Sequence, residues 1–205
     1  MPIFFQHQIN DTSKLAIWKI EEEEVFFSEI VPNHLEILHP QKRIQHLAGR
    51  FLLKFMEPEF PLEKIQAPQF GKPFLPNGEF NFSISHCGNF AAAILSKGGK
   101  VGIDIELSTP RTFKVATKYL SEKETEIFTN QFSQLDASLL TLLWSAKEAV
   151  FKWYGQNEVD FRKDIQLNSL NETANFIPCF FAKTKQQINI HFRQFENLWL
   201  TWVSD

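Results

Sequence analysis

Apolar residues recur along the chain with two periods, and these divide it into expected helices and strands. Over residues 41–56 and 137–154 they recur every three or four positions, as on one face of an amphipathic helix. Ser121 followed by Glu124 is a capping box and predicts the start of a further helix. Alternating or continuous apolar runs predict strands over 14–20, 80–87, 90–96, 101–107, 175–182, 187–195 and 198–204.

The order of these elements is strand, helix, strands, then strands, helices, strands, which predicts an α+β fold. Two segments resemble each other weakly, "LAGRFLLKF" at 47–55 and "SAKEAVFKW" at 145–153, with Lys54 and Lys152 both in the eighth position. This likeness indicates a duplication. The acidic run at 21–24 is expected to be a solvated turn or strand end, and "KGGK" at 97–100 taken alone predicts a hairpin within one sheet.

Composition narrows the class of protein. A 205-residue chain with 43% hydrophobic residues and 22 Phe can bury one large core or two of about 100 residues each. The net charge of -3 argues against a general nucleic-acid coat protein. Cys87 and Cys179 lie in no paired metal motif and are expected to be free thiols in a reducing cytoplasm. The N-terminus lacks a signal-peptide pattern, and no apolar run is long enough for a membrane helix, so we expect a soluble cytoplasmic protein.

Two acids interrupt the apolar run "KVGIDIELS", residues 100–108. Side chains alternate along a strand, so Gly102, Asp104 and Glu106 share one face and the apolar residues share the other. Two adjacent like charges repel each other unless a cation lies between them or water surrounds them. The pattern therefore predicts either a metal site or the wet face of an edge strand.

Two further polar pairs allow a functional and a structural interpretation. Glu148 and Lys152 are four residues apart on the predicted helix, as in an ordinary surface ion pair. Ser85 and His86 are also consistent with the polar end of a strand. Neither pair is specific alone. The order of four motifs is more informative: "GKPFLP", "FSISH", "GIDIE" and "WSAKEAVFK".

This ordered set, within about residues 41–155, resembles the 4′-phosphopantetheinyl transferase superfamily, in particular its monomeric, surfactin-synthetase-activating type. Such enzymes move the phosphopantetheine arm of coenzyme A to a serine of an acyl or peptidyl carrier protein and release 3′,5′-ADP. The resemblance implies two similar halves, 1–102 and 103–205, each a small antiparallel sheet packed on helices, with the active cleft between them. It implies a monomer that binds coenzyme A and an acidic carrier protein, without a nucleic-acid or membrane partner.

The resemblance also implies roles for individual residues. Mg²⁺, or Mn²⁺ in its place, would be held by Asp104, Glu106 and Glu148. Because Glu148 would then lie next to the metal and the attacked phosphate, it is the candidate base for the carrier serine, either through its free oxygen or through a water. Lys147 and Lys152 would neutralise phosphate oxygens. The further coenzyme A contacts would be Arg43, His46 and Arg50 near the 3′-phosphate, Lys72 and Pro73 beside the adenine, and Ser85 and His86 near the phosphates.

Other features bear on partners and alternatives. The basic cluster Arg111, Lys114 and Lys118 is a candidate surface for an acidic carrier. Cys87 stands where many relatives have serine or threonine. Two other functions share parts of the pattern: another metal-dependent phosphotransferase or nucleotide hydrolase, and a non-catalytic module that binds carriers or nucleotides. The sequence contains no Walker-type glycine loop, which argues against the common nucleotide enzymes.

Overall fold

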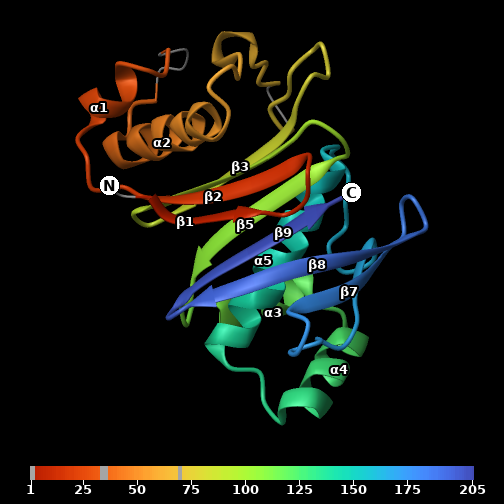
Figure 1. The fold of residues 1–205 in the computed structure, drawn as a ribbon. Helices are drawn as coiled ribbons and strands as arrows, with labels where there is room; N and C mark the ends of the chain where they lie inside the picture. The colour runs from red at the N-terminus through yellow and green to blue at the C-terminus, as the bar shows by residue number, and fades with distance from the viewer. Residues whose placement is uncertain (1–2, 33–36, 69–70) are drawn as a thin grey trace.

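Two antiparallel sheets lie face to face in the computed structural model, which describes residues 3–32, 37–68 and 71–205 (Figure 1). The first sheet has the order β1 (Ile3–Gln8), β2 (Ser13–Lys19), β4 (Phe90–Ser96), β3 (Asn81–Cys87). The second has the order β5 (Val101–Leu107), β9 (Leu198–Ser204), β8 (Gln186–Phe195), β7 (Phe176–Phe181), β6 (Ile165–Leu167). All strand pairs are antiparallel, as expected for an α+β fold.

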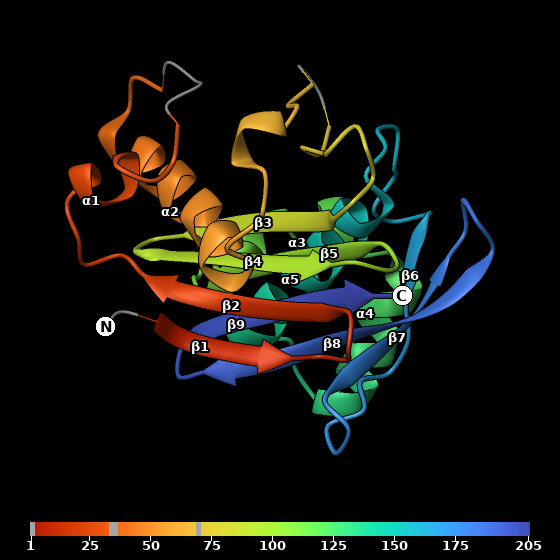
Figure 2. The ribbon, with the colours of Figure 1, turned by 45° about the horizontal axis from the view of Figure 1, so that its top comes forward.

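Helices cover the outer face of each sheet (Figure 2). On the first sheet lie α1 (Glu24–Ser28) and α2 (Pro40–Met56), followed by the short 3₁₀ helix η1 (Leu62–Lys64). On the second lies α5 (Ala137–Tyr154), and α3 (Thr112–Tyr119) and α4 (Glu122–Phe132) complete this side. None of the helices within the described ranges combines the length and apolarity needed to span a bilayer.

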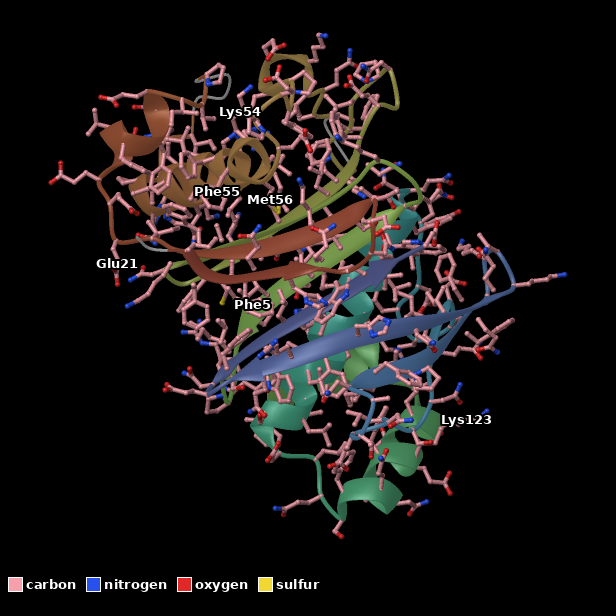
Figure 3. The ribbon with its side chains drawn as sticks, in the orientation of Figure 1. Phe5, Glu21, Lys54, Phe55, Met56 and Lys123 are labelled. Atoms are coloured by element: carbon pink, nitrogen blue, oxygen red, sulfur yellow. The ribbon has the colours of Figure 1, made fainter. Side chains whose placement is uncertain are left out.

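Strand alternation places the core in three layers. Side chains of both sheets fill the space between them, including Ile17 and Ile94 from the first and Ile103 and Leu200 from the second. Phe5 of β1, labelled in Figure 3, packs against this layer. The opposite faces pack against α2 and α5. The predicted division of residues 101–107 is confirmed, because Val101, Ile103 and Ile105 lie in the central layer while Gly102, Asp104 and Glu106 face α5.

Gly102 sets the distance between β5 and α5. A Cβ atom at this position would lie 2.1 Å from the carbonyl oxygen of Ala149 and 2.4 Å from the backbone nitrogen of Trp153. Any other residue would therefore push the helix backbone away from the strand. This close approach brings Glu148 and Lys152, each one residue before those contacts, beside the acids of β5.

The segment 97–100 leads from β4 in the first sheet to β5 in the second, so the hairpin that it predicts when taken alone does not form. The resemblance instead implies a division close to this segment. The structure differs from the sequence predictions in two other places. The acidic run is not only a turn, since α1 begins at Glu24, and the strands β1 and β6 were not expected. The division of the chain at residue 102 stays a prediction.

Candidate active site

A pocket of about 280 Å³ lies where the two halves meet. Its wall combines α2, the loop after residue 70, β3 and α5. Seven of the nine predicted coenzyme A contacts are at or beside this junction, and six of them line the pocket. The lining six are His46, Arg50, Lys72, Pro73, His86 and Lys152.

The seventh residue, Ser85, belongs to a buried network at the pocket floor. Lys152 Nζ donates hydrogen bonds to Asp104 Oδ1 at 2.6 Å and to Ser85 Oγ at 2.9 Å. The Ser85 hydroxyl in turn donates to Asp104 Oδ1 at 2.8 Å. Asp104 is only 2% exposed, and its Oδ2 has no hydrogen-bond partner in the described part of the chain. A buried carboxylate oxygen without a donor is costly, so this atom is available for a cation or another donor.

Glu106 and Glu148 add negative charge to the same place. Burial, followed by the charge of Asp104, raises the pKa of Glu106 above its usual value. The same two causes raise the pKa of Glu148 to about 7, against the opposing effect of Lys152. Clustered acids suppress each other's ionisation unless a cation compensates them. Even so, no three His, Cys, Asp or Glu side chains within the described ranges stand ready to hold a metal, so the three-carboxylate site stays a prediction.

Arg50 of α2 adds a positive charge to the pocket lining, which Lys152 of α5 also joins. Arg50 is 8% exposed, and its Nη1 lies 3.0 Å from Nδ1 of His46. Burial lowers the pKa of Arg50 to about 10, which still leaves the guanidinium charged at neutral pH. No carboxylate in residues 3–32, 37–68 or 71–205 forms an ion pair with it. A buried guanidinium of this kind favours an anionic ligand.

Lys72 and His86 line the pocket between these two ends. Lys72 Nζ donates to the backbone oxygen of Val101 at 2.6 Å, which ties the loop to the start of β5. Burial and the nearby charges of Lys100 and Lys152 lower the pKa of Lys72 to about 8. Partial burial and Lys152 also lower the pKa of His86, which favours its neutral imidazole.

Two predicted coenzyme A contacts lie elsewhere. Lys147 is fully buried and forms an ion pair with Glu124 at 2.6 Å, so the predicted contact of Lys147 with phosphate is wrong in this structure. The reason is helical geometry. Lys147 lies five positions before Lys152, so the two side chains leave the helix on different faces, and Lys147 points toward the core next to α4. Arg43 pairs with Glu24 at 2.7 Å, two helical turns from Arg50, and does not line the pocket.

The sequence interpretation missed two hydrogen bonds that join β3 to β5. Ser83 Oγ accepts from the backbone N–H of Ile103, and Cys87 Sγ accepts from the backbone N–H of Leu107, each at 3.3 Å. Together with Ser85, these residues occupy alternate positions on one face of β3. The signal was present as small polar side chains at 83, 85 and 87, but nothing local indicated which strand they meet.

Comparison with known proteins identifies the family. Residues 100–203 match the family model of the 4′-phosphopantetheinyl transferase superfamily. Enterobactin synthase component D of Salmonella typhi is 30% identical over 187 residues, which cover 85% of this chain and 77% of that protein. The 4′-phosphopantetheinyl transferase Sfp of Bacillus subtilis is 27% identical over 146 residues, 66% of this chain and 65% of Sfp. The 4′-phosphopantetheinyl transferase AcpT of Escherichia coli (strain K12) is 34% identical over 119 residues, 56% of this chain and 59% of AcpT. The chain therefore belongs to the 4′-phosphopantetheinyl transferase superfamily.

Proposed function

We propose that this protein transfers the 4′-phosphopantetheine group of coenzyme A to a serine of an apo acyl or peptidyl carrier protein and releases 3′,5′-ADP. The family supports this reaction. The observation that carries it to this chain is the polarity of the pocket. A buried guanidinium lies on one side, and a lysine beside clustered acids lies on the other. Coenzyme A carries a phosphate at the nucleotide end and a diphosphate farther along, and this spacing of charge fits that arrangement.

Different pocket residues are proposed to bind different parts of coenzyme A. Arg50, oriented by His46, is proposed to bind the 3′-phosphate, for which a planar guanidinium is well suited. Lys72 and Pro73 form the platform for the adenine, and the bond from Lys72 to Val101 keeps that platform in place. His86 and Lys152, with Ser85 behind them, face the diphosphate.

The acids fit a divalent cation. Asp104 Oδ2 has no donor among the described residues, and Glu106 and Glu148 carry raised pKa values that a cation would lower. Mg²⁺ commonly takes one or two carboxylates and completes its shell with phosphate oxygens and water, so a preformed cage is not required. We propose Asp104, Glu106 and Glu148 as ligands for Mg²⁺ or Mn²⁺. The ion would supply charge neutralisation on the diphosphate.

The chain itself supplies the proton acceptor and a charge for the leaving group. The oxygen of the carrier serine forms a bond to the β-phosphorus of coenzyme A, while the bond from that phosphorus to 3′,5′-ADP breaks. Glu148 takes the hydroxyl proton, either through a carboxylate oxygen that does not bind the ion or through a water. Lys152 neutralises the charge that develops on the departing phosphate.

The proposed carrier surface is α3. Arg111, Lys114 and Lys118 are exposed there, and Phe113 and Val115 between them are 52% and 37% exposed. A basic surface with an apolar centre suits an acidic carrier protein. The protein is proposed to act as a monomer of the surfactin-synthetase-activating type in the cytoplasm.

Mass spectrometry of carrier proteins tests the reaction. The purified protein, coenzyme A and Mg²⁺ should add one phosphopantetheine group to the serine of at least one apo carrier in a panel. Asp104→Asn should abolish the transfer, because it removes the charge that faces Lys152 and the cation, whereas Glu59→Gln at an exposed loop should not. Release of 3′,5′-ADP without a gain in carrier mass would indicate a hydrolase instead. Coenzyme A binding with neither product would indicate a non-catalytic module.

A further inference from the structure

The turn between β3 and β4 is hydrogen-bonded to helix α2. Gly88 and Asn89 form this turn, which begins two residues after His86, a residue of the pocket lining. Nε2 of Gln45 donates to the backbone oxygen of Gly88 at 2.7 Å. Nε2 of Gln41, one helical turn earlier, lies 3.2 Å from the same oxygen and 3.2 Å from Asn89 Oδ1. Two glutamines of α2 therefore hold the segment that follows His86.

The other side of the turn contacts the end of β5. Sγ of Cys87, directly before the turn, accepts the backbone N–H of Leu107 at 3.3 Å. A Cβ atom at Gly88 would lie 2.8 Å from Cδ1 of Leu107, and φ at Gly88 is +54°, a conformation that favours glycine. Leu107 follows Glu106, one of the proposed metal ligands. The turn therefore connects α2 with the end of β5 at which the proposed cation binds.

Gln45 makes the more constrained of the two glutamine contacts. Its side chain is 7% exposed, whereas that of Gln41 is exposed. A hydrogen bond from a buried donor costs more to break than one at the surface, where water replaces the lost partner. Gln45 also lies five positions before Arg50 on the same helix. One helix thus carries both the proposed contact to the 3′-phosphate and the bond that holds the turn beside His86.

Coenzyme A is proposed to reach both sides of the pocket at once, with its 3′-phosphate at Arg50 and its diphosphate at His86. A second charged group adds its full affinity only when both contacts fit one conformation of the ligand, since a mismatch strains the ligand or leaves one group unpaired. Dephospho-coenzyme A has the diphosphate without the 3′-phosphate, so its binding does not depend on this spacing. The ratio of the two affinities therefore reports how well Arg50 and His86 are spaced.

We propose that Gln45 is a positioning residue that sets the selectivity for coenzyme A over dephospho-coenzyme A. Its bond to Gly88 holds the β3–β4 turn, and with it His86, at the distance from Arg50 that one coenzyme A molecule spans. The inference rests on the proposed function, since it assigns the 3′-phosphate to Arg50 and the diphosphate to His86. The amide of Gln45 is neutral, so it contributes geometry and adds no charge to the pocket.

Calorimetric titration with coenzyme A and with dephospho-coenzyme A tests the proposal without a carrier protein and without turnover. Gln45→Met keeps the length of the side chain and removes the donor. The ratio of the two dissociation constants should move toward unity by roughly 10-fold, because the freed turn no longer keeps the two contacts in register. The change should come from weaker binding of coenzyme A, while the affinity for dephospho-coenzyme A stays nearly unchanged.

Two further variants separate positioning from folding. Gln131 holds a loop of the second half in the same manner, because its Nε2 donates to the backbone oxygen of Leu170 at 2.7 Å and its Oε1 accepts the N–H of Leu170 at 2.9 Å. Gln131→Met should therefore lower stability in urea and leave the affinity ratio unchanged. Gln41→Met removes the exposed donor to Gly88, so it should lower the ratio by a smaller factor, and it tests the same contact if Gln45→Met does not fold.

An unchanged ratio in every folded variant of Gln41 and Gln45 would overturn the inference. Equal losses of affinity for the two ligands would also overturn it, because they would indicate a general packing role. An unmodified protein that binds both ligands equally well would refute the spacing argument, whereas its modification of a carrier would leave the proposed reaction intact. If the unmodified protein selects coenzyme A but modifies no carrier, the proposed function fails instead.

Discussion

Replacing Gly102 by alanine should separate the effect of geometry on catalysis from the effect of side-chain chemistry. Gly102 carries no functional group, yet it lies where α5 crosses β5. The added Cβ would lie 2.1 Å from the oxygen of Ala149 and 2.4 and 2.8 Å from the backbone nitrogen and Cα of Trp153. All three are backbone atoms of the helix, so no side-chain rotation can relieve the contact.

The expected loss of rate follows from the distance by which α5 must move away from β5. To restore an ordinary van der Waals contact, the helix must retreat by about 1 Å. Glu148 and Lys152 move with it, away from Asp104, whose Oδ1 now lies 2.6 Å from Lys152 Nζ. A shift of about 1 Å in catalytic groups costs roughly 100-fold in rate, whereas overpacking costs about 1–3 kcal/mol of the free energy of unfolding. The variant should therefore fold but transfer phosphopantetheine roughly 100-fold more slowly.

The assay is carrier modification followed by mass spectrometry, with kcat, the KM for coenzyme A and the urea midpoint measured on the same preparation. Gly98→Ala is the matched control. Its Cβ would meet mainly the Oγ1 of Thr12, at 3.2 Å. The hydroxyl of this exposed side chain donates to Asn10 on the surface, so it can move without disturbing the site. A Gly102→Ala variant with the unmodified kcat would show that the spacing of β5 and α5 does not set the active geometry.

Two further predictions concern buried ionisable groups. Lys147→Met leaves the carboxylate of Glu124 buried without its cation, so the free energy of unfolding in urea should fall by about 3–5 kcal/mol, and adding Glu124→Gln should recover much of it. A stable Lys147→Met protein whose only defect is a higher KM for coenzyme A would restore the phosphate role. For His191, burial and then the charge of His7 lower the pKa below the ordinary 6.5, so the folded state binds this proton less readily than the unfolded state. Its stability contribution is complete above pH 6.5 and is lost as the pH falls through the lower folded-state pKa. His191→Gln should thus flatten the fall in unfolding free energy between about pH 7 and pH 5, and an unchanged slope would contradict the assignment.

The elements that the sequence predicted well carry local signals. Helix α5 begins and ends where the apolar period does, at Ala137 and Tyr154. Asp136 caps its start by accepting the N–H of Leu139 at 2.7 Å, and Gly155 ends it in the left-handed conformation. The alternation along β5 was predicted equally well, because a strand has only two faces.

The placements that failed depend on partners distant in sequence. Lys147 pairs with Glu124, which also serves a capping box and the N–H of Leu167, and no local pattern indicates that pair. Arg43 pairs with Glu24, which was expected to be a solvated acid. The wet face of an edge strand, one of the two predictions for Asp104, does not occur, because Lys152 and Ser85 cover this side chain and leave it 2% exposed. Periodicity gives the face of an element but not what lies against that face.

The weak likeness between segments 47–55 and 145–153 relates one residue on each side of the site. When the segments at 47–55 and 145–153 are aligned through Lys54 and Lys152, Arg50 corresponds to Glu148. The two helices cover equivalent outer faces of their sheets, so one position in the repeat carries a buried cation in the first half and an acid in the second. Lys54, labelled in Figure 3, does not act as Lys152 does, because its Nζ donates to the backbone oxygen of Phe60 instead of to a carboxylate. The difference at this pair of positions contributes a cation to the proposed phosphate-binding side and an acid to the proposed cation-binding side. Because each side lies in a different half, a rigid junction between β3 and β5 is a condition for both to act on one coenzyme.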